Sequence, residues 1–255
     1  NYEKYWDDIS PFIKYGYIKD EKFKGKMKEF ILYKNLEGKY VTLKDYLEAA
    51  KEKHENQVFY VTDEVQQAQY INMFKEQEMD AVILKHAIDQ PFISVVEQDE
   101  ENVKFHRIDT DLADIFKEEI NEEDSKVLEE NTKTLTDTFK KALGRDNIQV
   151  KVEKLKNAET SSMITLNEES RRMQDMMKMY GMTDMSMFGN EGETLILNAN
   201  NTLVQYVLAH GEGEYTDMIC QQLYDLALLS HKPLEASAMT AFIERSNKIL
   251  QALTK

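Results

Sequence analysis

Sulfur-containing side chains are unusually concentrated in this 255-residue chain, because seven of its 13 methionines lie within residues 170–188. In the helix that we expect from residue 168 onwards, the spacing i, i+3, i+4, i+7 creates one stripe of Met173, Met176, Met177 and Tyr180. The ordinary interpretation of such a stripe is a helix that faces the core. Its lack of leucine, and the adaptable shape of methionine, favour an exposed surface that binds varied partners. Copper binding by the thioethers is a weaker alternative, because no histidine or cysteine lies nearby.

The other residue types that could support catalysis or metal binding are scattered. No i, i+4 pair occurs among His54, His86, His106, His210 and His231, so we predict no metal site. The single cysteine, Cys220, lies among apolar helical residues and is expected to be a buried hydrophobe without nucleophilic activity. Adjacent acids at 118–123 are expected to be a solvated charge run. We therefore predict no catalytic, cofactor-binding or metal-binding residues in this chain.

Composition narrows the classes of partner. The net charge of −15 and the lack of a basic patch disfavour nucleic acid and anionic membranes as partners. Apolar runs such as 81–84 are far shorter than a bilayer span. A single cysteine excludes an intrachain disulfide framework, and no leader is apparent at the N-terminus. These features predict a protein of the reducing cytoplasm.

The first part of the chain is expected to build a small αβα sandwich. Residues 1–38 have helical spacing, and the following region, 39–110, alternates between helix and strand. Thr42 and Asp45 form a capping arrangement at the start of one helix. Strands are predicted at 57–62, 80–85 and 102–108. Asp63 can cap a helix between the first two strands, with Val65 on its apolar face. This strand–helix–strand order makes a βαβ unit, which requires parallel strands and a right-handed crossover.

The second part is expected to be an α+β domain. The acidic stretch 111–125 is interpreted as a linker, and residues 126–255 as a domain that ends in a helical bundle. Its first helix should end at Gly144. Strands are predicted at 148–155, 161–166 and 194–200, and the first two could pair. The fold class of the whole chain is therefore mixed α+β and α/β, and rich in helix.

The last helix carries an apolar seam with heptad spacing. Its positions are Ala236, Met239, Ile243, Ser246, Leu250 and Leu253, widened on one flank by Phe242 and Ile249. The preceding helix can cover part of this seam with Ile219, Leu223, Leu226 and Leu229. We expect the remainder to meet a second copy across a two-fold axis, which gives four helices from two chains. The alternative is a monomer in which the last helix packs wholly on its own sheet.

Several segments, in this order, give the chain a family resemblance: "YWDDISPFIKYGYIKDEKF", "VTLKDYL", "FYVTDE", "DAVILK" and "SRRMQDMMKMYG". They resemble the ninety-kilodalton heat-shock chaperones, most closely the bacterial form, high-temperature protein G. The resemblance extends over essentially all 255 residues. It implies the C-terminal part of a longer, ATP-dependent chaperone of the stress response. Residues 1–38 and 39–110 then correspond to the end of its middle domain, and residues 126–255 to its dimerisation domain.

The resemblance also implies specific roles. The family's cleft-facing helix matches 168–180, so Met173, Met176, Met177 and Tyr180 are expected to contact non-native client proteins. An acidic residue and a tryptophan of the family's middle-domain client site align with Gln90 and Pro91, which leaves Phe92 as the substitute contact. The dimer interface falls on the heptad seam. The ATP and magnesium sites of the family lie upstream, so no cofactor and no ATPase activity are expected in this chain.

A small enzyme domain is the alternative from a different class. It would use the βαβ unit at 57–85 as a cofactor site. Such a site needs a glycine-rich turn after the first strand, and the turn here reads "DEVQQ".

Overall fold

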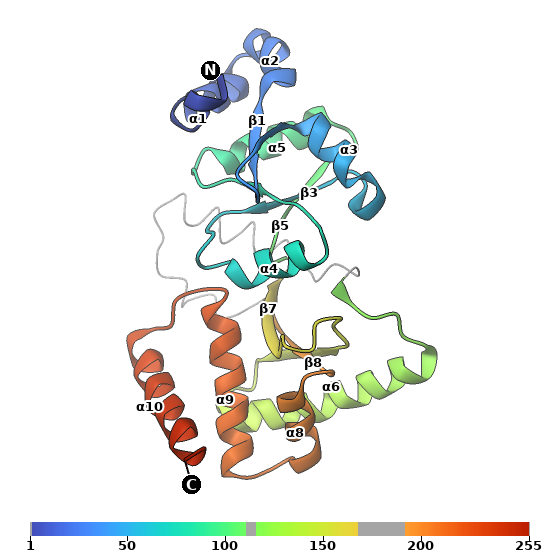
Figure 1. Cartoon of the computed structure of the whole chain (residues 1–255), viewed down its shortest axis with the longest axis vertical. Coiled ribbons are helices and arrows are strands. Elements are labelled where there is room, and N and C mark those ends of the chain that lie inside the picture. The colour runs from blue at the N-terminus through green and yellow to red at the C-terminus, as the bar shows by residue number, and fades with distance from the viewer. Residues whose placement is uncertain (1, 111–115, 168–191, 255) are drawn as a thin grey trace. The chain divides into compact units, whose positions relative to one another are not determined.

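The computed structural model describes residues 2–110, 116–167 and 192–254, which form two compact units (Figure 1). The methionine-rich stretch and residues 111–115 lie outside the described residues. Each unit combines helices with one mixed sheet, so the predicted fold class is confirmed. Within the described ranges, no helix is long and apolar enough to cross a bilayer.

The first unit has a five-stranded sheet in the order β2-β1-β4-β3-β5. Its elements, in chain order, are α1 Tyr2–Lys19, α2 Glu21–Met27, β1 Leu32–Asn35, β2 Tyr40–Thr42, α3 Leu43–His54, β3 Gln57–Val61, α4 Ala68–Glu76, β4 Val82–Ile83, α5 Asp89–Asp99 and β5 Lys104–Arg107. Strand β3 runs parallel to both β4 and β5, which confirms the βαβ prediction. Strands β1 and β2 form an antiparallel hairpin that the sequence prediction missed.

The faces of this sheet follow the period-2 alternation of β3. Phe59 packs edge-on against Phe74 of α4, with 4.9 Å between the ring centroids. Its neighbours Val58 and Tyr60 belong instead to the cluster that contains Phe92 of α5. Successive side chains of a strand point to opposite faces, so α4 and α5 cover opposite sides of the sheet (Figure 1).

Local chemistry sets several helix ends in this unit. The hydroxyl of Thr42 accepts a hydrogen bond from the backbone N–H of Asp45 at 3.2 Å, so the predicted cap of α3 is confirmed. The predicted start of α4 near Asp63 is wrong by several residues. Asp63 caps only a turn, and α4 begins at Ala68. Val65, expected on the apolar face of that helix, is therefore 89% exposed.

The second unit packs helices on a three-stranded sheet in the order β6-β8-β7. Its elements are α6 Glu122–Leu143, β6 Gln149–Glu153, β7 Ser162–Leu166, β8 Glu193–Asn198, α8 Thr202–His210, α9 Glu214–Leu229 and α10 Ala236–Ala252. Helix α6 begins inside the stretch interpreted as a linker, because the Asn121 side chain caps it by accepting from Asp124 N at 2.8 Å. It ends at Gly144, which adopts the left-handed conformation as predicted.

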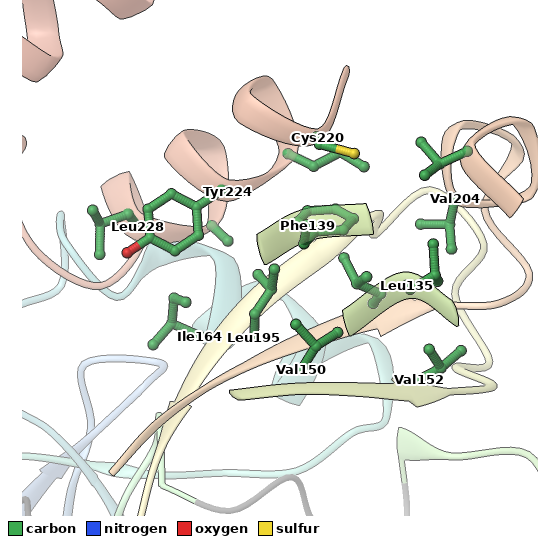
Figure 2. Packing of buried hydrophobic residues seen from close by; sticks show 14 of the residues in the cluster. Leu135, Phe139, Val150, Val152, Ile164, Leu195, Val204, Cys220, Tyr224 and Leu228 are labelled. Atoms are coloured by element: carbon green, nitrogen blue, oxygen red, sulfur yellow. The ribbon is translucent and has the colours of Figure 1, made fainter. Parts of the chain in front are cut away.

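The strands of this sheet are not paired as the sequence suggested. Strand β8 lies in the middle, parallel to β6 and antiparallel to β7, so β6 and β7 do not pair with each other. Figure 2 shows the core, in which Leu135 and Phe139 of α6 meet Leu195 of β8 and side chains of α9. Helix α9 therefore lies on the core, and α10 packs beside it (Figure 1).

Candidate interaction surface

The apolar seam of α10 divides into a covered part and an exposed part. Met239 and Phe242 pack against the core cluster of the second unit. Ser246 and Ile249 are half-buried. The other seam positions face solvent: Ala236, Ile243 at 52% exposure, Leu250 at 60% and Leu253 at 79%. The structure therefore leaves much of the predicted dimer seam uncovered within one chain.

Helix α9 adds one more side chain to this surface. Leu226 is 42% exposed and lies one turn beyond Gln222, on the side of α9 that contacts α10. The other α9 residues expected to cover the seam are drawn into the core, with Leu223 fully buried and Ile219 packed against the same cluster. We call Leu226, Ile243, Leu250 and Leu253 the exposed seam.

Arg245 is the main polar link between α10 and α9, and sequence reasoning missed it. Its Nε donates to the Gln222 side chain at 2.9 Å, and its Nη2 forms a short ion pair with Asp225. The guanidinium also lies 5.8 Å from the ring centroid of Phe242. In the sequence, the burial of Arg245 could have been recognised from its position on an apolar helix face, with Phe242 three residues before it and Ile249 four residues after it.

The connection between α9 and α10 is held to the sheet by a second ion pair. Lys232 Nζ lies 2.5 Å from Glu193 Oε1, at the first residue of β8. His231 Nε2 lies 3.8 Å from the same oxygen, and both the His231 and Glu193 side chains are almost fully buried. Pro233, in this connection, precedes the first residue of α10 by three positions.

Phe92 does not have the surface that its predicted role requires. Its side chain is 0% exposed, and its ring packs edge-on against Tyr17 at 5.2 Å between centroids. Lys14 Nζ lies 5.5 Å from the ring centroid, and Lys14 forms a buried ion pair with Asp89 at 2.5 Å. Phe92 thus joins α1 to α5 as a core residue. The prediction that Phe92 contacts client proteins does not hold, because its side chain is not accessible. The aligned positions Gln90 and Pro91 are half-buried at the start of α5.

The predicted client residues Met173, Met176, Met177 and Tyr180 lie outside the described residues. Their contact with clients stays a prediction that rests on the sequence pattern.

The βαβ unit offers little to a phosphate-bearing cofactor. The backbone N–H groups of Thr62 and Asp63, which follow β3, already donate to the Gln67 side chain at 2.8 Å and 3.1 Å. A dinucleotide site uses such N–H groups, together with a glycine-rich turn, to hold its phosphates. Because Gln67 takes both donors and the turn has no glycine, the enzyme alternative is not favoured.

The remaining candidate groups resemble ordinary structural residues. Cys220 is fully buried, and burial raises the pKa of its thiol to about 12. The expectation of a small buried hydrophobe is therefore confirmed for Cys220. In the part of the chain that the structure describes, no group of three or more histidine, cysteine or acidic side chains is arranged to hold a metal ion.

Comparison with known proteins adds family information to this geometry. The family described as "Hsp90 protein" matches residues 1–254. A chaperone protein htpG of Bacteroides fragilis (strain YCH46) is 31% identical over 226 residues, which cover 84% of this chain and 32% of that protein. A chaperone protein HtpG of Porphyromonas gingivalis is 26% identical over 277 residues, which cover 100% of this chain and 40% of that protein. The chain thus spans about a third to two fifths of the length of these relatives.

Proposed function

Because the chain belongs to the Hsp90 family, we propose that it supplies the self-association and client-binding surfaces of an ATP-dependent chaperone that assists protein folding. The observation that carries this proposal is the exposed seam on α9 and α10. The match to chaperone proteins over about a third to two fifths of their length is consistent with one part of a larger machine. We also propose that the whole protein acts as a chaperone in the stress response.

Self-association accounts for the pattern of exposure on α10. Met239 and Phe242 are covered by the chain's own core, whereas Ile243, Leu250 and Leu253 are open to water. Several large apolar side chains exposed on one helix are typical of protein–protein contact sites. Two copies related by a two-fold axis would cover each other's seam and bring α9 and α10 of both into a four-helix arrangement.

The oligomeric state tests this proposal directly. We expect sedimentation velocity at micromolar concentration to give a particle of twice the 29.8 kDa chain mass. Dilution should produce the monomer, and the transition should follow mass action. A protein that stays monomeric over the whole micromolar range would contradict the proposal.

Client binding is the second part of the proposed function, and it rests on the methionine stripe. We propose that Met173, Met176 and Met177 contact exposed apolar segments of non-native proteins. Replacing all three with serine should weaken the suppression of client aggregation and leave the melting temperature nearly unchanged. A large fall in melting temperature with unaltered client binding would show that the stripe belongs to the core.

We propose that this chain does not hydrolyse ATP by itself. The β3–α4 turn supports this, because Gln67 occupies the backbone donors that a phosphate would need. Calorimetric titration with ATP and with NAD is the simplest test. Tight binding of either nucleotide would favour the enzyme alternative at 57–85.

We also propose a cytoplasmic location without nucleic-acid or membrane partners. The net charge of −15 disfavours polyanionic partners, and a free, buried Cys220 is consistent with a reducing compartment. Retention on DNA or on anionic vesicles at physiological ionic strength would contradict the second.

A further inference from the structure

Within α10, which the structure describes throughout, the one buried residue is an arginine. Arg245 is 8% exposed, whereas the apolar residues of the same helix are half-buried or open to solvent. Burying a guanidinium has a substantial desolvation cost unless charge and hydrogen bonds compensate it. Burying Arg245 between α10 and α9 therefore costs more free energy than burying an apolar side chain there would. Phe242 and Ile249 already supply apolar side chains on the same face of α10.

The contacts of Arg245 are directional and involve three side chains of α9. Nε and Nη2 reach Gln222 and Asp225, and Nη1 lies 3.4 Å from the Gln221 side-chain oxygen. Gln222 in turn donates to Ser246 of α10 at 3.1 Å. A planar guanidinium satisfies such a set of acceptors at one helix crossing only, because each bond has a narrow range of angles.

The network continues from α9 to the long helix beneath it. Gln221 Nε2 donates to the backbone carbonyl of Ala142 on α6 at 2.9 Å. The position of Arg245 is thereby tied to the body of the second unit as well as to its neighbouring helix.

The apolar part of the seam defines the register of α10 only weakly. Ile243 and Leu250 are seven residues apart, and a slip of α10 by one heptad would put one in the place of the other. The same slip would put Ile249 in the place of Phe242, because these two are also seven apart, and Ser246 in the place of Met239. At most seam positions one apolar side chain would replace another, and hydrophobic contact is not directional, so the contact of Met239 with the core is the main apolar interaction that the slip would lose.

The same slip is unfavourable for the polar network. It would bring Ala238 or Ala252 to the position of Arg245, and Asp225 would lose its cation. An unpaired carboxylate in a half-buried position is strongly destabilised, so charge pairing adds a strong and directional preference for one register to the weaker preference of apolar packing. Buried polar residues set register in coiled coils by the same principle.

We propose that Arg245 and Asp225 are the positioning residues of the self-association surface. They hold α10 at one register on α9, so that the exposed seam meets a second copy of this chain in a single arrangement. This inference rests on the proposed self-association and adds the residues that determine its geometry.

The test measures the arrangement of the two copies. A spin label is attached to a cysteine introduced by Lys133→Cys, at an exposed position of α6, and the label-to-label distance is measured by pulsed electron paramagnetic resonance. Cys220 does not compete for the label, because it is fully buried and its thiol has a pKa of about 12. We expect one narrow distance distribution for the protein with native α9 and α10.

The decisive variant replaces both charges, Arg245→Met together with Asp225→Leu. Apolar replacement of a buried pair removes the charges without leaving one unpaired, so this variant is expected to fold and to associate. Its distance distribution should become broad or multiple, with shifts of up to about 10 Å, the rise of one heptad. The matched control, Lys248→Met with Glu244→Leu, removes one positive and one negative charge at exposed positions of α10 and should keep the narrow distribution.

Two single variants separate positioning from simple stability. Arg245→Met leaves Asp225 unpaired and should lower the melting temperature, whereas Arg245→Lys keeps the charge and should partly restore the narrow distribution. An unchanged narrow distribution in the double variant would overturn the positioning role and leave the proposed self-association intact. A monomeric parent protein would instead refute the proposed self-association itself.

Discussion

Charging the middle of the exposed seam should separate the two copies. The substitutions are Ile243→Glu and Leu250→Glu, at side chains that are 52% and 60% exposed in one chain. Complete burial of such a side chain contributes about 1.5–3 kcal/mol, so covering its exposed part contributes about 1–1.5 kcal/mol. Two residues in each of two copies therefore account for about 4–6 kcal/mol of association free energy. Desolvation of the introduced carboxylates increases the loss.

This loss is large compared with a typical association free energy. A micromolar dissociation constant corresponds to about 8 kcal/mol, so the double variant should dissociate at least about a thousandfold more readily. Sedimentation velocity at micromolar concentration should then find only monomer. The melting temperature of the dissociated variant should match that of the parent protein diluted to monomer, because both side chains are open to water in one chain.

A second pair of glutamates provides the matched control. Ser237→Glu with Gln251→Glu adds the same charge to exposed positions on the side of α10 that carries Glu244 and Lys248. This control should remain associated, apart from a small effect of net charge. Dissociation of both double variants would point to general repulsion, and a seam variant that stays associated would show that the copies meet elsewhere.

Three further predictions concern the interior of the two units. Cys220 should resist alkylation by iodoacetamide at mildly alkaline pH in the native protein and react at once in denaturant, since burial raises its thiol pKa to about 12; rapid native labelling, followed by mass spectrometry, would contradict this. Burial lowers the pKa of His54 below its ordinary value of 6.5, so the unfolded state takes up the proton first. The unfolding free energy of the first unit should therefore be constant above about pH 6.5 and decrease as the pH falls below that value. A His54→Phe variant, measured by urea titration, should lose this part of the pH dependence. Lys14→Met leaves Asp89 buried without its cation, at a cost of about 3–5 kcal/mol in chemical denaturation, and adding Asp89→Asn should recover most of it; equal costs for the single and double variants would mean that the pair contributes only packing.

Helix ends were predictable where a single side chain sets them. Thr42 with Asp45 starts α3, and Gly144 ends α6, as their local chemistry indicates. These features involve residues within one turn of each other, so a linear sequence contains all the information they need. The start of α4 was misjudged because Asp63 caps a turn with the same hydrogen bonds that begin a helix.

Short strands depended on partners that the sequence does not display. Strand β4 has two residues, and β1 has four, yet the two pair with each other in the five-stranded sheet. Strand β1, which the sequence analysis did not predict, is paired on one side by β4, about fifty residues further along the chain, and no local pattern reveals that partner. The central place of β8 between β6 and β7 is a similar case, because pairing order is a property of the assembled sheet.

For the interaction surface, periodicity was sufficient to identify the helix and its seam. The heptad spacing of Ile243, Leu250 and Leu253 depends only on residue order, and an apolar stripe on a terminal helix predicts a contact whatever the rest of the fold. The family resemblance was likewise present in residue order alone, and the match over residues 1–254 confirms it.

Which side chains remain open was decided by tertiary packing. Leu223 and Leu226 are both leucines of α9, three residues apart, yet one lies in the core and the other at 42% exposure. Phe92 was expected at a surface and is buried beneath α1, while Arg245, which the sequence analysis did not single out, lies buried against Asp225. Sequence spacing tells which residues share a face, but the cost of burying a ring or a charge depends on the groups that surround it, and only the folded chain brings those groups together.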